Sequence, residues 1–248
     1  MRTFNRVSGH CRKVSLLLIA VTTQFALAQS HPPMETEADF HRAMDELSNW
    51  GRWGDEDELG AANLITPEKR KEAASLVQEG IVVSLAHDVN QEPAVDASAV
   101  LTREVLRVSP TGASDRYEYS GSYHGTIHSH LDALDCHIMY EGSGYNGVTY
   151  QEVEAAGGCP RGDINAHKDG IVTRGVLFDA TLLPGRATAD GWLEPGTAIN
   201  YDDLLALEEI QGVRVEPGDV ILLYTGRWKR REALGAWPTS EGVAGYHA

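Results

Sequence analysis

Hydrophobic and polar positions along the chain alternate between helical and strand-like periods. Helical periodicity covers residues 38–48 and 201–210, and the second of these segments has a helix start at Asn200 or Asp202. A third helix should begin at 66–68, where a threonine N-cap, a proline at the first helical position and a glutamate in the first turn stand together. Each of these residue types favours a helix start, so three helices are expected.

Short apolar runs predict five strands, each bounded by turn-forming residues. They lie at residues 81–85, 100–108, 125–134, 171–177 and 220–224. The run at 81–85 is continuously apolar, which is typical of a buried strand. Strands and helices mixed in this order predict an α/β fold, and the length of the chain suits one domain.

The first 28 residues have the three parts of an export signal. A basic stretch without acids is followed by an apolar run at 14–21, which is too short to span a bilayer. Ala-Leu-Ala at 26–28 then offers the small-x-small cleavage pattern, so cleavage is expected before Gln29. Residues 29–48 would form a leader and the first helix. We therefore expect a periplasmic or secreted protein without membrane contact after signal cleavage, and an uncleaved anchor is the alternative.

The charge of the chain limits its partners. The full sequence carries a formal charge of −15, and loss of the four basic residues of the signal changes this to −19. Such an acidic surface repels phosphate backbones, so nucleic acid is excluded as a partner. A small-molecule substrate is expected instead, and the sequence is compatible with a homo-oligomer without fixing the number of subunits.

Two cysteines, Cys136 and Cys159, remain after loss of the signal. An oxidising compartment permits a disulfide between them, but two cysteines do not form a framework, and their pairing stays open. Neither cysteine has Cys-x-x-Cys spacing, so a thiolate zinc site is not indicated.

The segment from His124 to His137 contains the candidate metal-binding and catalytic residues. Four of the ten histidines of the chain fall within it, together with two aspartates. If residues 128–132 are extended, the alternating side chains of His128, His130 and Asp132 share one face. Two imidazoles and a carboxylate suit Zn²⁺, Mn²⁺ or Fe²⁺ and leave coordination positions open. The alternative is a polar strand edge with solvated histidines, which four histidines in this spacing make less favourable.

Four further residues each have more than one interpretation. His124 can join the metal site only if Gly125 lets the backbone bend back, and it is otherwise a loop histidine. His137 lies beyond the predicted strand and is a candidate proton shuttle, a second-metal ligand or a surface residue. Trp50 and Trp53, on a glycine-rich loop, either cover an aromatic substrate or pack in the core.

The His-x-His-x-Asp-Ala-Leu core at 128–134 resembles the metal-dependent cyclase family. That family includes bacterial kynurenine formamidases, isatin hydrolases and trans-dienelactone hydrolases. The similarity covers roughly residues 49–248. Six further segments carry it, at residues 53–55, 59–67, 140–147, 173–179, 217–220 and 223–228.

The resemblance implies a single compact α/β domain with the family's swivelling β/β/α layout. It also implies a hydrolase of amide, lactone or cyclic acyl bonds. Zn²⁺ or Mn²⁺ would be held by His128, His130 and Asp132, joined by His124, and would activate a water molecule. His137 would deliver a proton to the leaving atom. An exported metal- or ligand-binding protein without turnover is the alternative. A serine hydrolase is disfavoured because the chain has no Gly-x-Ser-x-Gly elbow.

The sequence departs from the family pattern at three places. Thr126 stands where short members have a histidine, although longer members resemble the chain in their His124 and His128 pattern. His137 follows Asp132 by five residues instead of four. Residues 245–248 resemble the beginning of the segment that carries the family's distal histidine, so the C-terminal part of the domain is expected to be missing.

Overall fold

The computed structural model describes residues 34, 36–97, 99–134, 136–137 and 139–247. The described residues belong to one compact unit. The predicted export signal lies outside them. None of the helices in this part of the chain has the length and apolar character that a membrane span requires.

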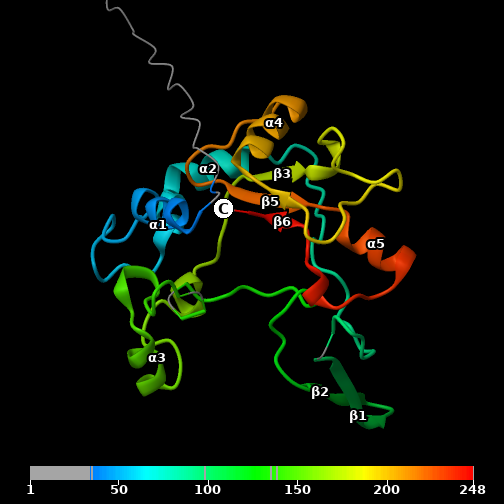
Figure 1. Ribbon diagram of the computed structural model, residues 1–248. Coiled ribbons are helices and arrows are strands. Elements are labelled where there is room, and N and C mark those ends of the chain that lie inside the picture. The colour runs from blue at the N-terminus through cyan, green and yellow to red at the C-terminus, as the bar shows by residue number, and fades with distance from the viewer. Residues whose placement is uncertain (1–33, 35, 98, 135, 138, 248) are drawn as a thin grey trace, which may run out of the picture. The chain divides into compact units, whose positions relative to one another are not determined.

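Figure 1 shows where the α-helices of the described residues lie. These five helices begin at N-caps or, for the last, at a glycine turn. The side chains of Thr36, Thr66, Thr149 and Asn200 each accept a hydrogen bond from a backbone N–H in the first turn of the following helix, which satisfies a donor that the helix itself leaves free. The α-helices are α1 (Glu37–Glu46), α2 (Pro67–Ser75), α3 (Tyr150–Ala156), α4 (Tyr201–Gln211) and α5 (Arg227–Leu234). The 3₁₀-helices are η1 (Gly60–Leu64), η2 (Tyr145–Gly147), η3 (Ile164–His167), η4 (Ala180–Leu182) and η5 (Thr239–Glu241).

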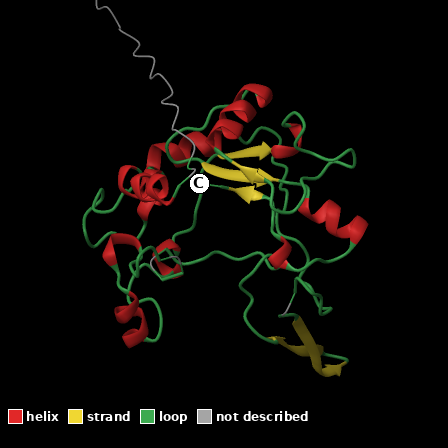
Figure 2. Cartoon of the chain, viewed as in Figure 1, coloured by secondary structure: helices red, strands yellow, loops and turns green. Residues whose placement is uncertain are grey.

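In the part of the chain that the structure describes, six strands form three separate pairs. β1 (Leu101–Ser109) and β2 (Gly112–Tyr119) make an antiparallel hairpin whose side chains are mostly exposed. β3 (Gly175–Asp179) pairs in parallel with β5 (Val220–Tyr224), and the two-residue strands β4 (Ala198–Ile199) and β6 (Gly245–Tyr246) form the third pair. Long irregular segments connect these elements (Figure 2).

The hydrophobic core lies between α4 and the β3–β5 pair. Phe178 of β3, Ile199 of β4 and Leu207 of α4 are its largest fully buried side chains. The parallel connection from β3 to β5 runs through α4, which contacts β3, as expected where a helix covers a parallel pair. This core holds the carboxyl ends of β3 and β5 in place.

A buried ionic network joins α2 to both strands of this pair. The fully buried carboxylate of Asp219 accepts hydrogen bonds from Arg174 at 2.6 and 3.0 Å and lies 3.0 Å from Nζ of Lys69. The Arg174 guanidinium and the Lys69 ammonium hold the pKa of Asp219 far below its usual range, although burial alone would raise it. Gly218 has φ +85°, and a Cβ there would meet the carbonyl oxygen of Leu64 at 2.4 Å, so only glycine fits this turn.

Several sequence predictions are confirmed. The α/β class is correct, helices occur at all three predicted places, and Asn200 is the N-cap of α4. The strand predicted at 220–224 is β5 with the same bounds, and the strand predicted at 100–108 is β1 within one residue at each end.

Other predictions are wrong. Residues 81–85 do not form a buried strand: they pair with no strand among the described residues, and Val82 is 94% exposed. Residues 125–134 are irregular, with Gly125 at φ +136° where a strand needs an extended backbone. The strand predicted at 171–177 begins only at Gly175.

Candidate metal centre

The loop that follows β2 turns back on itself at Gly125. Its φ of +136° is a conformation that residues with a side chain rarely adopt. The turn brings His124 next to Asp132, with 2.9 Å between Nδ1 of the imidazole and Oδ1 of the carboxylate. Gly125 therefore allows the backbone reversal on which a ligand role of His124 depends.

Three side chains form a close group. One donor atom from each of His124, His130 and Asp132 can be chosen so that all three lie within 4.8 Å of one another. Nε2 of His130 is 3.4 Å from Oδ1 of Asp132. Two nitrogen donors and one carboxylate suit Zn²⁺, Mn²⁺ or Fe²⁺, and donors about 2.0–2.2 Å from a shared ion would lie somewhat closer together than this outer limit. The residues present therefore fit a divalent ion of this class.

The hydrogen bonding of His130 favours this use of the group. Its Nδ1 is 2.7 Å from the carbonyl oxygen of His128. A carbonyl oxygen only accepts, so Nδ1 donates this hydrogen bond, and Nε2 is the ring nitrogen left to bind a metal ion. Metal-binding histidines commonly have their second nitrogen fixed in this way. The side chain is also the least exposed of the group, at 15%.

His128 lies outside this group. Its Nε2 is 2.7 Å from the carbonyl oxygen of Ala99, to which it donates a hydrogen bond, and its ring meets Tyr119 edge to face with centroids 5.4 Å apart. The extended backbone that would align His128 with His130 and Asp132 does not form. The structure therefore brings together His124, His130 and Asp132 from the predicted ligand set.

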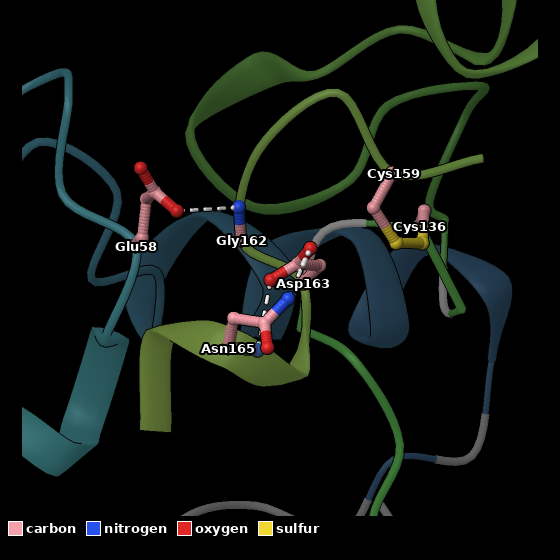
Figure 3. Close-up of a disulfide and its surroundings, with 6 residues drawn as sticks. All are labelled: Glu58, Cys136, Cys159, Gly162, Asp163 and Asn165. Atoms are coloured by element: carbon pink, nitrogen blue, oxygen red, sulfur yellow. Dashed lines mark hydrogen bonds between the residues drawn. A yellow bond between two sulfur atoms is a disulfide. The ribbon is translucent and has the colours of Figure 1, made fainter. Parts of the chain in front are cut away.

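His137 flanks the group. Its ring stacks on that of His124, with centroids 4.8 Å apart, and its Nε2 is 3.5 Å from Oδ2 of Asp132. The preceding residue, Cys136, forms a disulfide with Cys159, and their Cα atoms are 5.3 Å apart (Figure 3). The sequence had left this pairing open. The disulfide anchors the backbone directly before His137 to the segment that follows α3.

Figure 3 also shows what holds the far side of this disulfide. The backbone N–H of Gly162 donates a hydrogen bond to the Glu58 carboxylate at 2.9 Å, and Asp163 accepts two from Asn165. Arg161 donates to the backbone carbonyls of Asp55 and Asn146 at 2.9 Å. The contacts of Arg161 and Gly162 fix the segment after Cys159 to the loop before η1 and to η2.

A family model with the description "Putative cyclase" matches residues 37–246. The chain belongs to this cyclase family. A solved structure described as the crystal structure of a novel cyclase is similar to it, with a TM-score of 0.67 and 29% sequence identity over 82% of this chain and 70% of that chain. A search of curated proteins found no match.

The family assignment confirms the resemblance carried by the histidine-aspartate core and the later segments. It also supports an enzyme and a single α/β domain for this cyclase, with a His-His-Asp group that could bind a metal.

One aromatic residue of the site was missed by sequence reasoning. The ring of Tyr123 stacks on His124 with centroids 4.7 Å apart and meets His130 edge to face at 5.6 Å. It therefore limits the orientations open to both imidazoles. A tyrosine before a histidine carries no signal of this role in a single sequence.

Proposed function

We propose that this cyclase-family protein is a metal-dependent hydrolase that cleaves an amide, lactone or other cyclic acyl bond of a small molecule. The observation that carries the proposal is the group of His124, His130 and Asp132, in which Nδ1 of His130 is engaged by a backbone carbonyl and Nε2 lies 3.4 Å from the carboxylate. A bound Zn²⁺ or Mn²⁺ would supply Lewis acidity, polarising the acyl carbonyl and lowering the pKa of a water molecule toward about 7.

The residues of the chain have separate roles in this proposal. His124, His130 and Asp132 hold the ion, and the carbonyl oxygen of His128 fixes the tautomer of His130. The group lies open to solvent on one side, because the side chains of His124 and Asp132 are 43% and 38% exposed. Substrate and water can therefore reach it without a large rearrangement.

His137 is the proposed proton donor to the leaving nitrogen or oxygen. It lies beside the group, with Nε2 at 3.5 Å from Oδ2 of Asp132, and it stacks on a proposed ligand without belonging to the closest donor set. The amine of an amide is a poor leaving group unless its nitrogen is protonated. An imidazole positioned to donate that proton therefore accelerates the reaction. The carboxylate of Asp132 orients the ring.

The proposal extends to location and metal. The N-terminal signal pattern supports export to the periplasm or medium, where the Cys136–Cys159 disulfide can persist. The donor set suits Zn²⁺ and Mn²⁺ equally, so both ions belong in any test.

The test combines metal content with turnover on one preparation. Chelator-treated protein is loaded with Zn²⁺ or Mn²⁺ and dialysed. Its metal content is measured by elemental analysis, and its hydrolytic activity is measured on an aryl formamide, a cyclic amide and a lactone. His130→Ala should lose most of the metal and the activity, whereas His167→Ala, in η3 and outside the close donor group, should keep both. Metal retained by wild type without hydrolysis of any of these bonds would favour a binding protein. Equal metal in His130→Ala and wild type would remove His130 from the site.

A further inference from the structure

A buried aspartate, Asp96, lies next to the stretch from His124 to Asp132, which we call the metal loop. The side chain of Asp96 is fully buried, and Arg231 of α5 binds it with two hydrogen bonds of 2.8 and 3.0 Å. Nη2 of Arg227, one helical turn earlier, is 3.8 Å from the same carboxylate. Both arginines thus face one negative charge, and the hydrogen bonds from Arg231 hold the pKa of Asp96 below its usual range.

Arg227 extends this network to the metal loop. Its Nη2 donates a hydrogen bond of 2.8 Å to Oγ1 of Thr126, and its guanidinium lies 4.4 Å from the ring centroid of Trp237. The other two nitrogens, Nε and Nη1, are buried and have no hydrogen-bond partner within the described residues. Burial of a cation with so few partners is costly, so the bond to Thr126 is one of the few that compensate it.

Three consecutive residues anchor the middle of the loop. Thr126 accepts the bond from Arg227, Ile127 is buried with 7% exposure, and His128 donates to the carbonyl oxygen of Ala99. The proposed ligands His124 and His130 project from the two ends of this anchor, two residues away on either side. The anchor therefore determines how the two imidazoles face each other and Asp132.

We infer that Thr126 is a positioning residue of the metal centre, which acts through its hydroxyl bond to Arg227. The inference rests on the proposed metal site but concerns a residue that is not itself in the close donor group. Loss of the hydroxyl would release the loop and also leave a third nitrogen of a buried guanidinium without its partner. Partners outside the ligand sphere typically change metal affinity by about 10–100-fold when they are removed.

The test is a matched set of substitutions. Thr126→Val keeps the shape but removes the hydroxyl, and it should weaken metal binding by about 10–100-fold. Thr126→Ser keeps the hydroxyl and should bind like wild type. Thr102→Val is the control, because the Thr102 hydroxyl donates to the carbonyl oxygen of Glu118 at 3.2 Å in the exposed hairpin. If the valine variant at 126 fails to fold, as judged by circular dichroism, Thr126→Ala replaces it with the same expectation.

The readout separates positioning from general stability. Chelator-stripped full-length protein is titrated with Zn²⁺ against a competing chelator, and with Co²⁺ while its visible absorption bands report ligand geometry. Thr126→Val should show both a weaker affinity and an altered Co²⁺ spectrum, with serine restoring both. Wild-type affinity and spectrum in Thr126→Val, or equal losses in the valine and serine variants, would overturn the role of Thr126 but not the proposed metal centre. A wild-type protein that binds neither ion would overturn the proposed metal centre, and this inference with it.

Discussion

Replacing Asp219 with asparagine removes the negative charge at the centre of the buried ionic network. In the native protein this carboxylate accepts two hydrogen bonds from Arg174 and one of 2.7 Å from the backbone N–H of Glu216, and it lies 3.0 Å from Nζ of Lys69. Asparagine keeps the size of the side chain and one acceptor oxygen. The substitution therefore tests the charge more than the packing.

Removing one partner of a buried ion pair usually costs about 3–5 kcal/mol, because the other charge stays buried without compensation. Here the half-exposed carboxylate of Glu216 remains 3.2 Å from Lys69 and 3.3 Å from Arg174, and it takes over part of the compensation. We therefore expect Asp219→Asn to lower the free energy of unfolding by about 2–4 kcal/mol. Domains are typically stable by only about 5–15 kcal/mol, so this loss is easily measured.

The matched control is Asp115→Asn in the hairpin. Asp115 also binds an arginine, Arg103 at 2.9 Å, but that arginine side chain is 54% exposed, and exposed ion pairs contribute little to stability. Urea unfolding followed by tryptophan fluorescence, in the presence of a chelator and with the disulfide intact, compares the two variants with wild type. Similar losses in both variants would refute the reasoning.

The pH dependence gives a second check. The pKa of Asp219 is lowered in the folded protein, so its contribution is fully present above the unfolded value of about 3.9 and is lost as the pH falls below it. The difference between wild type and Asp219→Asn should then narrow by about 1 kcal/mol per pH unit below pH 4. A difference that stays constant down to pH 3 would contradict the assigned charge.

Two further predictions concern the proton donor and export. His137→Ala should keep the metal but lower turnover by about 10²–10⁴-fold, less on substrates with good leaving groups, and a parallel loss of metal and rate would make His137 a ligand instead. Mass spectrometry of protein secreted by the producing cell should find Gln29 at the amino terminus, and recovery of the intact Met1 form from the cytoplasm would exclude signal cleavage.

The parts of the fold that could be predicted are those that local chemistry specifies. Thr66 and Pro67 mark the start of α2 because an N-cap hydroxyl and a proline act within one turn of the chain. The apolar run at 81–85 fails for the opposite reason, since a strand needs a partner, and no pattern within five residues shows whether one exists. The hairpin strand β2 was missed because its exposed residues show no apolar alternation.

The same distinction between local and long-range determinants applies to the candidate site. Spacing alone singled out His128, His130 and Asp132, of which the structure brings the last two into the close group, and Gly125 indicated how His124 could reach them. Thr126 and Arg227 are 101 residues apart in the sequence, so no local pattern predicts their contact. The direction of the His128 ring also depends on a residue far away in the sequence, because it donates to the carbonyl oxygen of Ala99, and strand periodicity carries no information about that contact.

All three donors of the close group lie on one short stretch of chain, from His124 to Asp132. A stretch of this kind can capture an ion while the rest of the chain is still unfolded. Because only the difference in affinity between folded and unfolded chains adds to stability, metal should raise the melting temperature less than its affinity for the folded protein suggests. Which ion the protein carries then depends partly on the divalent cations present where it folds, and not only on the preference of the finished site.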